Sequence, residues 1–226
     1  MNYKVLITGS TGMVGKGVLY ECMDHPAISG ILLLNRRAVG IDHPKITELI
    51  LEQFDDFSQL PAEFLQVDAC FFCMGISALG KSEQEYTRIT HDITLNLARK
   101  LSGENPEMLF CYVSGQGTNA NSKTMWARVK GVTEQELQQL PFKKVVLFRP
   151  GFIQPRRGIR SATGWYNLIY KISTPFYPLL KRLSGNAITN TTNVGLAMIN
   201  CLLVENHPML LDNREINRLA NSASNF

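Results

Sequence analysis

A glycine-rich stretch near the start of the chain has the residue types and spacing of a phosphate-binding loop. The stretch TGSTGMVG places Gly9, Gly12 and Gly15 between a short apolar run and a helical pattern. In such a loop the first glycine allows a sharp turn, the second lets backbone approach a pyrophosphate, and the third lets the helix pack close to the sheet. Free N–H groups and the dipole at the helix start then favour the phosphates. The predicted dinucleotide contacts here are Gly9, Ser10, Thr11, Gly12, Met13, Val14 and Gly15.

The residues after the second apolar run bear on which dinucleotide binds. Asn35, Arg36 and Arg37 stand where an Asp or Glu would bind the ribose diol of NAD, and no acidic residue is available there. An arginine at this point suits the 2′-phosphate of NADP, because its planar fork can bind two oxygens at once. We therefore expect these three residues to contact NADP(H) rather than NAD(H). The alternative is that the two arginines are only solvated residues at a strand end.

Further cofactor contacts are expected where other strands end, because ligands of open α/β sheets bind outside the carboxyl ends of the strands. Glu52, with Asp55 as the alternative, follows the third strand, near the expected adenine. Gly75 and Ile76 follow the fourth strand, where glycine allows close approach to the cofactor. Pro150 and Gly151 follow the sixth strand, near the expected nicotinamide, although this pair would also form an ordinary turn.

The elements that must hold these residues alternate between short β-rich runs and longer helical patterns. Several of the short runs are almost continuously apolar, as buried parallel strands are. The predicted strands are 3–8, 28–34, 46–51, 69–74, 109–114 and 144–148. The predicted helices are 14–23, 84–101, 125–140 and 193–204. The pattern predicts an α/β fold, a Rossmann-type doubly wound parallel sheet flanked by helices, with a short C-terminal cap.

The chain is expected to form a single NAD(P)-binding domain over residues 1–226, because this length can bury a full core without disulfide or metal staples. Turn residues cluster after Pro150, so residues 151–190 are expected to form the cap on the substrate side. Its aromatic and basic segment 165–183 could close an apolar substrate pocket, cover a homodimer or protein-partner surface, or lie on anionic lipid. Two internal prolines weigh against the lipid alternative, because they break a long amphipathic helix.

Composition and charge exclude several classes of protein. The net charge of +4 is too small and too dispersed for a nucleic-acid footprint, and no apolar run approaches the ~20 residues of a membrane span. The five cysteines lie mostly in apolar runs, which fits free thiols in a reducing compartment, so we expect a cytoplasmic protein. Cys70 and Cys73 should point to opposite faces of a strand rather than form a redox or zinc pair. The histidines have no ligand spacing, so no metal site is expected.

Six short motifs occur in an order that resembles a known family. These motifs are TGSTGMVG, NRR, FFCMG, VSGQG, ARVKG and FRPG. Together they resemble the atypical, epimerase-like short-chain dehydrogenase/reductases, and especially the Tat-interacting-protein group of oxidoreductase-like proteins. The resemblance covers roughly residues 3–183. It implies a Rossmann-type domain, NADP(H) binding, and a Ser, Tyr and Lys set for carbonyl reduction or alcohol oxidation, without naming a substrate.

Carried over to this chain, the family's catalytic set falls on Ser114, on Lys130 and, in the place of the tyrosine, on Trp126. In the family the phenol exchanges a proton with the substrate oxygen, the lysine lowers the phenol pKa and binds the nicotinamide ribose, and the serine orients the carbonyl. Trp126 and Lys130 keep the four-residue spacing that places both on one helix face. An indole does not ionise at physiological pH, so Trp126 can hydrogen-bond or stack on a ligand but cannot exchange a proton.

This tryptophan leaves three hypotheses about function. The first is NADP(H)-linked reduction of an apolar carbonyl compound, with another acid supplied by Tyr166, Tyr170 or Thr124. The second is a catalytically inactive NADP(H)-binding regulatory or scaffolding protein that keeps Ser114 and Lys130 as cofactor contacts. The third is a quinone or flavin-type reductase, in which hydride transfer needs no tyrosine acid.

Overall fold

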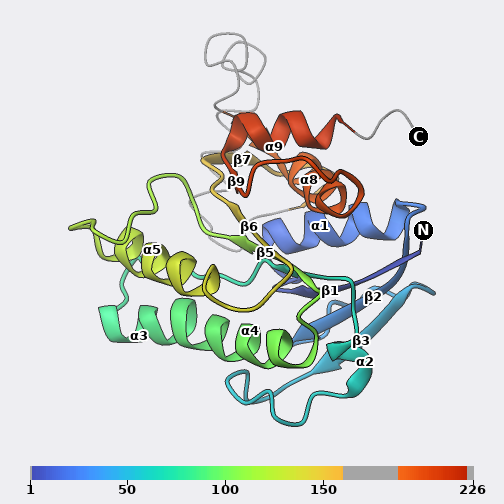
Figure 1. Cartoon of the computed structure of the whole chain (residues 1–226), viewed down its shortest axis with the longest axis horizontal. Coiled ribbons are helices and arrows are strands. Elements are labelled where there is room, and N and C mark those ends of the chain that lie inside the picture. The colour runs from blue at the N-terminus through green and yellow to red at the C-terminus, as the bar shows by residue number, and fades with distance from the viewer. Residues whose placement is uncertain (1, 160–187, 223–226) are drawn as a thin grey trace.

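A seven-stranded parallel sheet forms the middle layer of the molecule (Figure 1). The computed structural model describes residues 2–159 and 188–222. The strands follow the order β3-β2-β1-β4-β5-β6-β9 across the sheet, so the order reverses direction between β1 and β4. This reversal is the topological switch point at which doubly wound sheets bind ligands. The strands are β1 Tyr3–Thr8, β2 Ile28–Asn35, β3 Ile46–Ile50, β4 Ala69–Phe72, β5 Leu109–Val113, β6 Lys144–Phe148 and β9 Leu210–Leu211.

Helices cover both faces of the sheet, which confirms the predicted Rossmann-type class. Helices α1, α8 and α9 lie on one face, and α3, α4 and α5 lie on the other (Figure 1). A separate pair of parallel strands, β7 and β8, lies outside the main sheet. The bounds are α1 Met13–Asp24, α2 Ala62–Leu65, α3 Glu83–Thr87, the π-helical turn η1 Arg88–Asp92, α4 Ile93–Glu104, α5 Met125–Leu137, β7 Phe152–Gln154, β8 Ile188–Asn190, α8 Thr191–Leu203 and α9 Asn213–Ala220.

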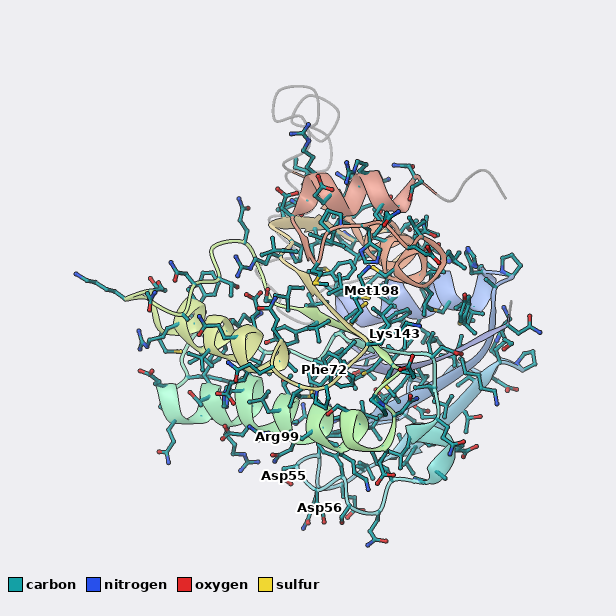
Figure 2. All side chains as sticks on the ribbon, viewed as in Figure 1. Asp55, Asp56, Phe72, Arg99, Lys143 and Met198 are labelled. Atoms are coloured by element: carbon teal, nitrogen blue, oxygen red, sulfur yellow. The ribbon has the colours of Figure 1, made fainter. Side chains whose placement is uncertain are left out.

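Each face of the sheet has its own apolar core, because successive side chains of a strand point to opposite sides. Along β1, Val5 and Ile7 enter the core under α1 and α8, whereas Leu6 enters the core under α4. Phe72 and Met198 mark these two cores on either side of the sheet (Figure 2). The near-continuous apolar runs of the central strands thus reflect burial on both faces.

Cys70 and Cys73 belong to opposite faces, which confirms the prediction from their strand spacing. Cys70 lies in the core under α4, and Cys73 packs against the core under α8, with its sulfur 4.0 Å from that of Met198. All five cysteines are free thiols. Burial raises the pKa of the Cys22, Cys70 and Cys111 thiols, so these side chains pack as small apolar groups.

The helix predicted over residues 84–101 is confirmed in extent, but it is not a single α-helix. The segment forms α3 and α4 with the π-helical turn η1 between them. A π turn adds one residue to the helical repeat, and here it carries His91, whose Nε2 lies 2.9 Å from Glu136 Oε1 on α5. Helix α3 begins with a side-chain cap, because the Ser82 hydroxyl accepts a hydrogen bond from Glu85 N at 3.2 Å.

Three predicted strands end one or two residues earlier than expected. Strand β3 stops at Ile50, β4 at Phe72 and β5 at Val113, so Cys73 and Ser114 lie just beyond the sheet. The short strands β7, β8 and β9 were not predicted, since two or three residues carry no periodicity. No helix within residues 2–159 or 188–222 has the length and apolar character needed to cross a membrane.

The cap predicted over residues 151–190 is described only at its two ends. Strands β7 and β8 pair in parallel, with Phe152 opposite Ile188 and Gln154 opposite Asn190. Residues 160–187 lie outside the described residues, so the predicted roles of segment 165–183 and of its tyrosines remain predictions.

Candidate active site

The glycine loop joins β1 to α1 with backbone contacts too close for larger residues. Gly9 has a φ of 69°, and a β-carbon there would lie 2.7 Å from Met74 N in the chain after β4. A β-carbon on Gly15 would overlap the carbonyl oxygen of Gly9. Gly12 N donates a hydrogen bond to that same oxygen at 2.9 Å. The first and third glycines therefore let α1 start directly against the loop.

The first turn of α1 offers backbone N–H groups that a dinucleotide pyrophosphate could use. Gly12 is the N-cap of α1, and none of the described side chains caps this end by a hydrogen bond. Met13 and Val14 form the first turn and are half-buried, and Thr11 is exposed beside them. An uncapped helix start with a favourable dipole is a site for an anion. The residues present therefore fit the phosphates of a dinucleotide.

Asn35 at the end of β2 is fixed by its neighbours. Its Nδ2 lies 2.7 Å from Ser10 Oγ, and the Ser10 hydroxyl lies 3.0 Å from Asn35 Oδ1. Its Nδ2 also donates to Glu48 Oε1 on β3 at 2.7 Å, and Val39 N donates to the same oxygen at 2.9 Å. Asn35 is only 3% exposed and Ser10 is fully buried. These bonds hold the glycine loop, the end of β2 and the next turn together.

The turn after Asn35 presents Arg36 and Arg37, and both are exposed. An acidic residue that sequence reasoning missed reaches this turn from β3, because Glu48 accepts hydrogen bonds from Asn35 and Val39. Its signal in the sequence is a single acidic residue inside the apolar run ITELI. One of its carboxylate oxygens accepts hydrogen bonds from Asn35 and Val39, so Glu48 fixes the backbone from which the arginines extend.

The chain beyond β4 and β6 approaches the glycine loop from the same edge of the sheet. Gly75 is exposed, and a β-carbon there would meet nothing within 4 Å among the described atoms. Ile76 beside it is half-buried. Pro150 is buried and its carbonyl accepts from Gln116 N at 2.9 Å, whereas Gly151 N donates to Asn213 Oδ1 at 3.0 Å. Open space at the first glycine and fixed backbone at the second suit contacts with a bound molecule.

Glu52 is exposed two residues beyond β3. No contact of its carboxylate within the described residues ties it to the loop, and its predicted place near the adenine remains a prediction.

A buried cluster of charged residues lies beyond β5 and β6. Ser114 Oγ donates to Glu134 Oε1 at 2.5 Å, and Arg149 Nε lies 3.0 and 3.1 Å from the two oxygens of the same carboxylate. Arg149 Nη2 also donates to Glu134 Oε2. Lys130 Nζ donates to the Ser114 carbonyl oxygen at 2.5 Å. The structure thus brings Ser114 and Lys130 together, and the Ser114 hydroxyl is hydrogen-bonded to another side chain of the protein.

The charges of this cluster depend on one another, because the Glu134 side chain is only 2% exposed. Its hydrogen bonds raise the pKa of the Arg149 guanidinium, so Arg149 stays charged. Burial lowers the pKa of Lys130 to about 8, and the nearby Glu134 carboxylate opposes this shift. Sequence reasoning missed Glu134, although an acidic residue four positions after a functional lysine places both on one helix face.

Trp126 lies one helical turn before Lys130 and is half-buried. A β-carbon on Gly117 would lie 3.4 Å from its ring carbon Cη2, so the indole packs over that glycine, which has a φ of 88°. The position that resembles the family's tyrosine is thus filled by an aromatic ring that cannot ionise. Thr124, the third proposed substitute acid, is the N-cap residue of α5 and is exposed.

Curated relatives align with about two thirds of this chain at about 25% sequence identity. Protein fmp52 of Aspergillus fumigatus, named as mitochondrial, is 26% identical over 164 residues, which is 68% of this chain and 68% of that protein. Protein HTATIP2 of Rattus norvegicus is 25% identical over 154 residues, which is 67% of this chain and 63% of that protein. The second relative confirms the resemblance to the Tat-interacting-protein group.

Solved structures share the fold at low sequence identity. The Bordetella bronchiseptica enzyme WbmH, solved with NAD+, has a TM-score of 0.65 and 15% identity, and the match covers 90% of this chain and 73% of that chain. A short chain dehydrogenase of Burkholderia cenocepacia, solved with NADP, has a TM-score of 0.66 and 13% identity, with 98% and 94% covered. One of these neighbours binds NAD+ and the other NADP, so the fold alone does not select between the two cofactors.

The expected cytoplasmic location is wrong on these comparisons. The relatives from Aspergillus fumigatus and Saccharomyces cerevisiae, both 26% identical to this chain, are named as mitochondrial proteins. The expectation relied on free thiols, and buried free thiols are compatible with any reducing compartment.

The family model for "NAD dependent epimerase/dehydratase family" matches residues 5–143, which is more than half of the chain. The matched stretch includes the glycine loop, the Asn35 turn, Ser114 and Lys130. Together with the switch-point topology and the open start of α1, this match shows that the chain belongs to the NAD dependent epimerase/dehydratase family, an oxidoreductase-type family with an NAD(P)-binding Rossmann fold.

Proposed function

We propose that the protein binds NADP(H) at the carboxyl edge of its sheet and reduces an apolar carbonyl compound with it. The observation that carries the choice of cofactor is the exposed pair Arg36 and Arg37 after β2. Asn35, just before the pair, is held by Ser10 and Glu48, so the arginines extend from a fixed backbone. Two guanidinium groups in such a place suit a 2′-phosphate, and less ordering on binding favours affinity.

The rest of the cofactor follows the sheet edge in this proposal. The glycine loop and the first turn of α1 bind the pyrophosphate, and Glu52 lies toward the adenine. Gly75 and Ile76 lie against the middle of the cofactor. Pro150 and Gly151 lie against the nicotinamide side, and Lys130 binds the ribose next to it. This assignment is supported by the shared edge at which β1, β4, β5 and β6 end.

We also propose that the chain acts as one domain and that segment 165–183 closes the substrate side. The support for this cap is its point of departure, because β7 follows Gly151 directly and β8 returns beside β7. Its aromatic side chains suit an apolar substrate.

A titration with NADPH and with NADH tests the cofactor assignment. Arg36→Ala should weaken NADPH binding by about 10- to 100-fold, corresponding to about 1.5–3 kcal/mol for a lost charge-assisted contact, and should leave NADH binding unchanged. Arg99→Ala is the matched control, because Arg99 is an exposed arginine on the outer side of α4 (Figure 2). Equal loss for both nucleotides, or no binding of either one to the wild-type protein, would contradict the proposal.

A panel of apolar aldehydes and ketones tests the reaction through oxidation of NADPH. Trp126→Tyr should raise turnover, because it places an ionisable phenol one turn before Lys130. The absence of turnover with every compound, together with unchanged behaviour of Trp126→Tyr, would exclude carbonyl reduction.

A second candidate is a nucleotide-binding regulator without chemistry. It is favoured by the indole of Trp126 over Gly117 and by the commitment of the Ser114 hydroxyl to Glu134. Steady NADPH consumption that Lys130→Ala abolishes would exclude it. A quinone or flavin-type reductase would instead show faster NADPH oxidation when a quinone is added.

A further inference from the structure

Replacement of the family's tyrosine by Trp126 leaves the reduction without its usual proton donor. We propose that Lys130 is the proton donor of this protein, and that its ammonium group protonates the carbonyl oxygen of the substrate. This inference rests on the proposed NADP(H)-linked reduction and names the acid that the reduction needs.

The side chains around Lys130 cannot provide this proton. The indole of Trp126 does not ionise, and the Ser114 hydroxyl already donates its single hydrogen to Glu134. Arg149 is bound to that same carboxylate, and a guanidinium does not give up a proton in proteins. Burial raises the pKa of the Tyr112 phenol, which keeps it protonated inside the core. Among the described residues this leaves Lys130 as the acid at the carboxyl ends of β5 and β6.

The geometry of Lys130 suits proton donation. Its Nζ donates one hydrogen to the Ser114 carbonyl oxygen at 2.5 Å, and an ammonium group carries two more. The side chain is half-buried, so solvent can restore the proton after each turnover. Burial brings its pKa to about 8, close to the pH at which a general acid works best.

The reduction is balanced when NADPH provides the hydride and Lys130 provides the proton. NADPH, when bound, supplies the hydride that forms the new C–H bond at the carbonyl carbon. The C–O π electron pair takes the proton of Lys130, which forms the O–H bond of the alcohol and leaves a neutral amine. The amine then takes a proton from water, and the products are the alcohol and NADP+.

The neighbouring charges favour an ammonium that can still be deprotonated. Glu134, one turn further along α5, stabilises the ammonium form of Lys130. The same carboxylate is also paired with Arg149, which follows β6. Tyr112 from β5 and Tyr86 from α3 have pKa values raised by burial and stay neutral. The charged groups on the other faces of α5 and on α3, η1 and α4 contact one another: Glu83, Arg128, His91, Asp92, Arg99 and Glu136.

The deciding experiment compares wild-type protein with Lys130→Arg, which keeps a positive charge and hydrogen-bond donors but cannot release a proton. NADPH affinity should be retained, whereas kcat with an accepted carbonyl compound should fall by about 100-fold or more. In the wild type, kcat should decline above pH 8, as the Lys130 amine loses its proton. The matched control is Lys143→Arg, because Lys143 is exposed beside β6 (Figure 2).

A second measurement needs no turnover. Acetylation of Lys130 in the wild-type protein, followed across pH by peptide mass spectrometry, reports the fraction of neutral amine. Its midpoint should coincide with the decline of kcat. The proposal is overturned if Lys130→Arg keeps its turnover, if kcat stays level through the labelling midpoint, or if Tyr166→Phe or Tyr170→Phe abolishes the reaction instead. If the wild-type protein oxidises no NADPH with any carbonyl compound, the proposed function fails first, and this inference fails with it.

Discussion

Gly15 and Gly75 differ in how much space surrounds them, although both belong to the candidate site. A β-carbon on Gly15 would overlap the Gly9 carbonyl, whereas one on Gly75 would enter open space. Gly15→Ala should therefore lower the free energy of unfolding by about 1–3 kcal/mol, as overpacking does. Gly75→Ala should leave stability unchanged and weaken NADPH binding. Urea unfolding and nucleotide titration of both variants test this contrast, and equal stability losses would refute it.

Lys130 should also make stability depend on pH. Burial lowers its pKa from 10.5 to about 8, so between these pH values the unfolded chain binds more protons than the folded one. Below this window the buried charge costs stability, and as pH rises through the window the cost is relieved. Relative to Lys130→Met, the wild type should gain on the order of 1–2 kcal/mol in unfolding free energy between about pH 7 and about pH 10, because solvent contact reduces the full linkage. A constant difference would contradict the lowered pKa.

The ion pair between Glu134 and Arg149 links α5 to the end of β6. Removing Arg149 leaves the Glu134 carboxylate buried without its main partner, because Glu134 is only 2% exposed, so Arg149→Met should lower the unfolding free energy by about 3 kcal/mol. The double variant with Glu134→Gln should lose less than the two single losses added together. Lys143→Ala is the control, because its pair with Glu107 is exposed and should contribute under about 1 kcal/mol. Additive losses in urea unfolding would exclude the coupling.

The sequence predicted the main strands because most of them are short, almost continuously apolar runs that alternate with helical patterns. It could not predict β9, which has two residues, or the π turn, whose His91 contacts Glu136 on α5. The site shows the same division. The glycine loop follows from local spacing, but Glu48 and Glu134 come to it from elements whose relative placement only the packed sheet and helices determine.

For the whole molecule, nucleotide binding and folding should be coupled. The proposed cofactor contacts come from segments after β1, β2, β3, β4 and β6 and from α5, and these segments do not form a site in the unfolded chain. NADPH at about 100 times its Kd should raise the unfolding free energy by about 2.7 kcal/mol. NADH at the same concentration should raise it less, and Arg36→Ala should reduce the gap between the two nucleotides. Denaturant unfolding with and without each nucleotide measures this, and no shift with either would contradict a dinucleotide site.

The small parallel pair of β7 and β8 has a consequence for how such proteins diversify. The chain stays in contact with α1 as far as Arg157, which pairs with Glu21 and Asp24. It returns at Ile188 within a two-stranded unit that shares no strand with the seven-stranded sheet. The intervening stretch can therefore be exchanged for that of a relative without changing the register of any strand in the main sheet. A chimera made at these two junctions should keep the parent's preference between NADPH and NADH. It should also take on the substrate preference of the donor protein, so that substrate range can change independently of cofactor preference.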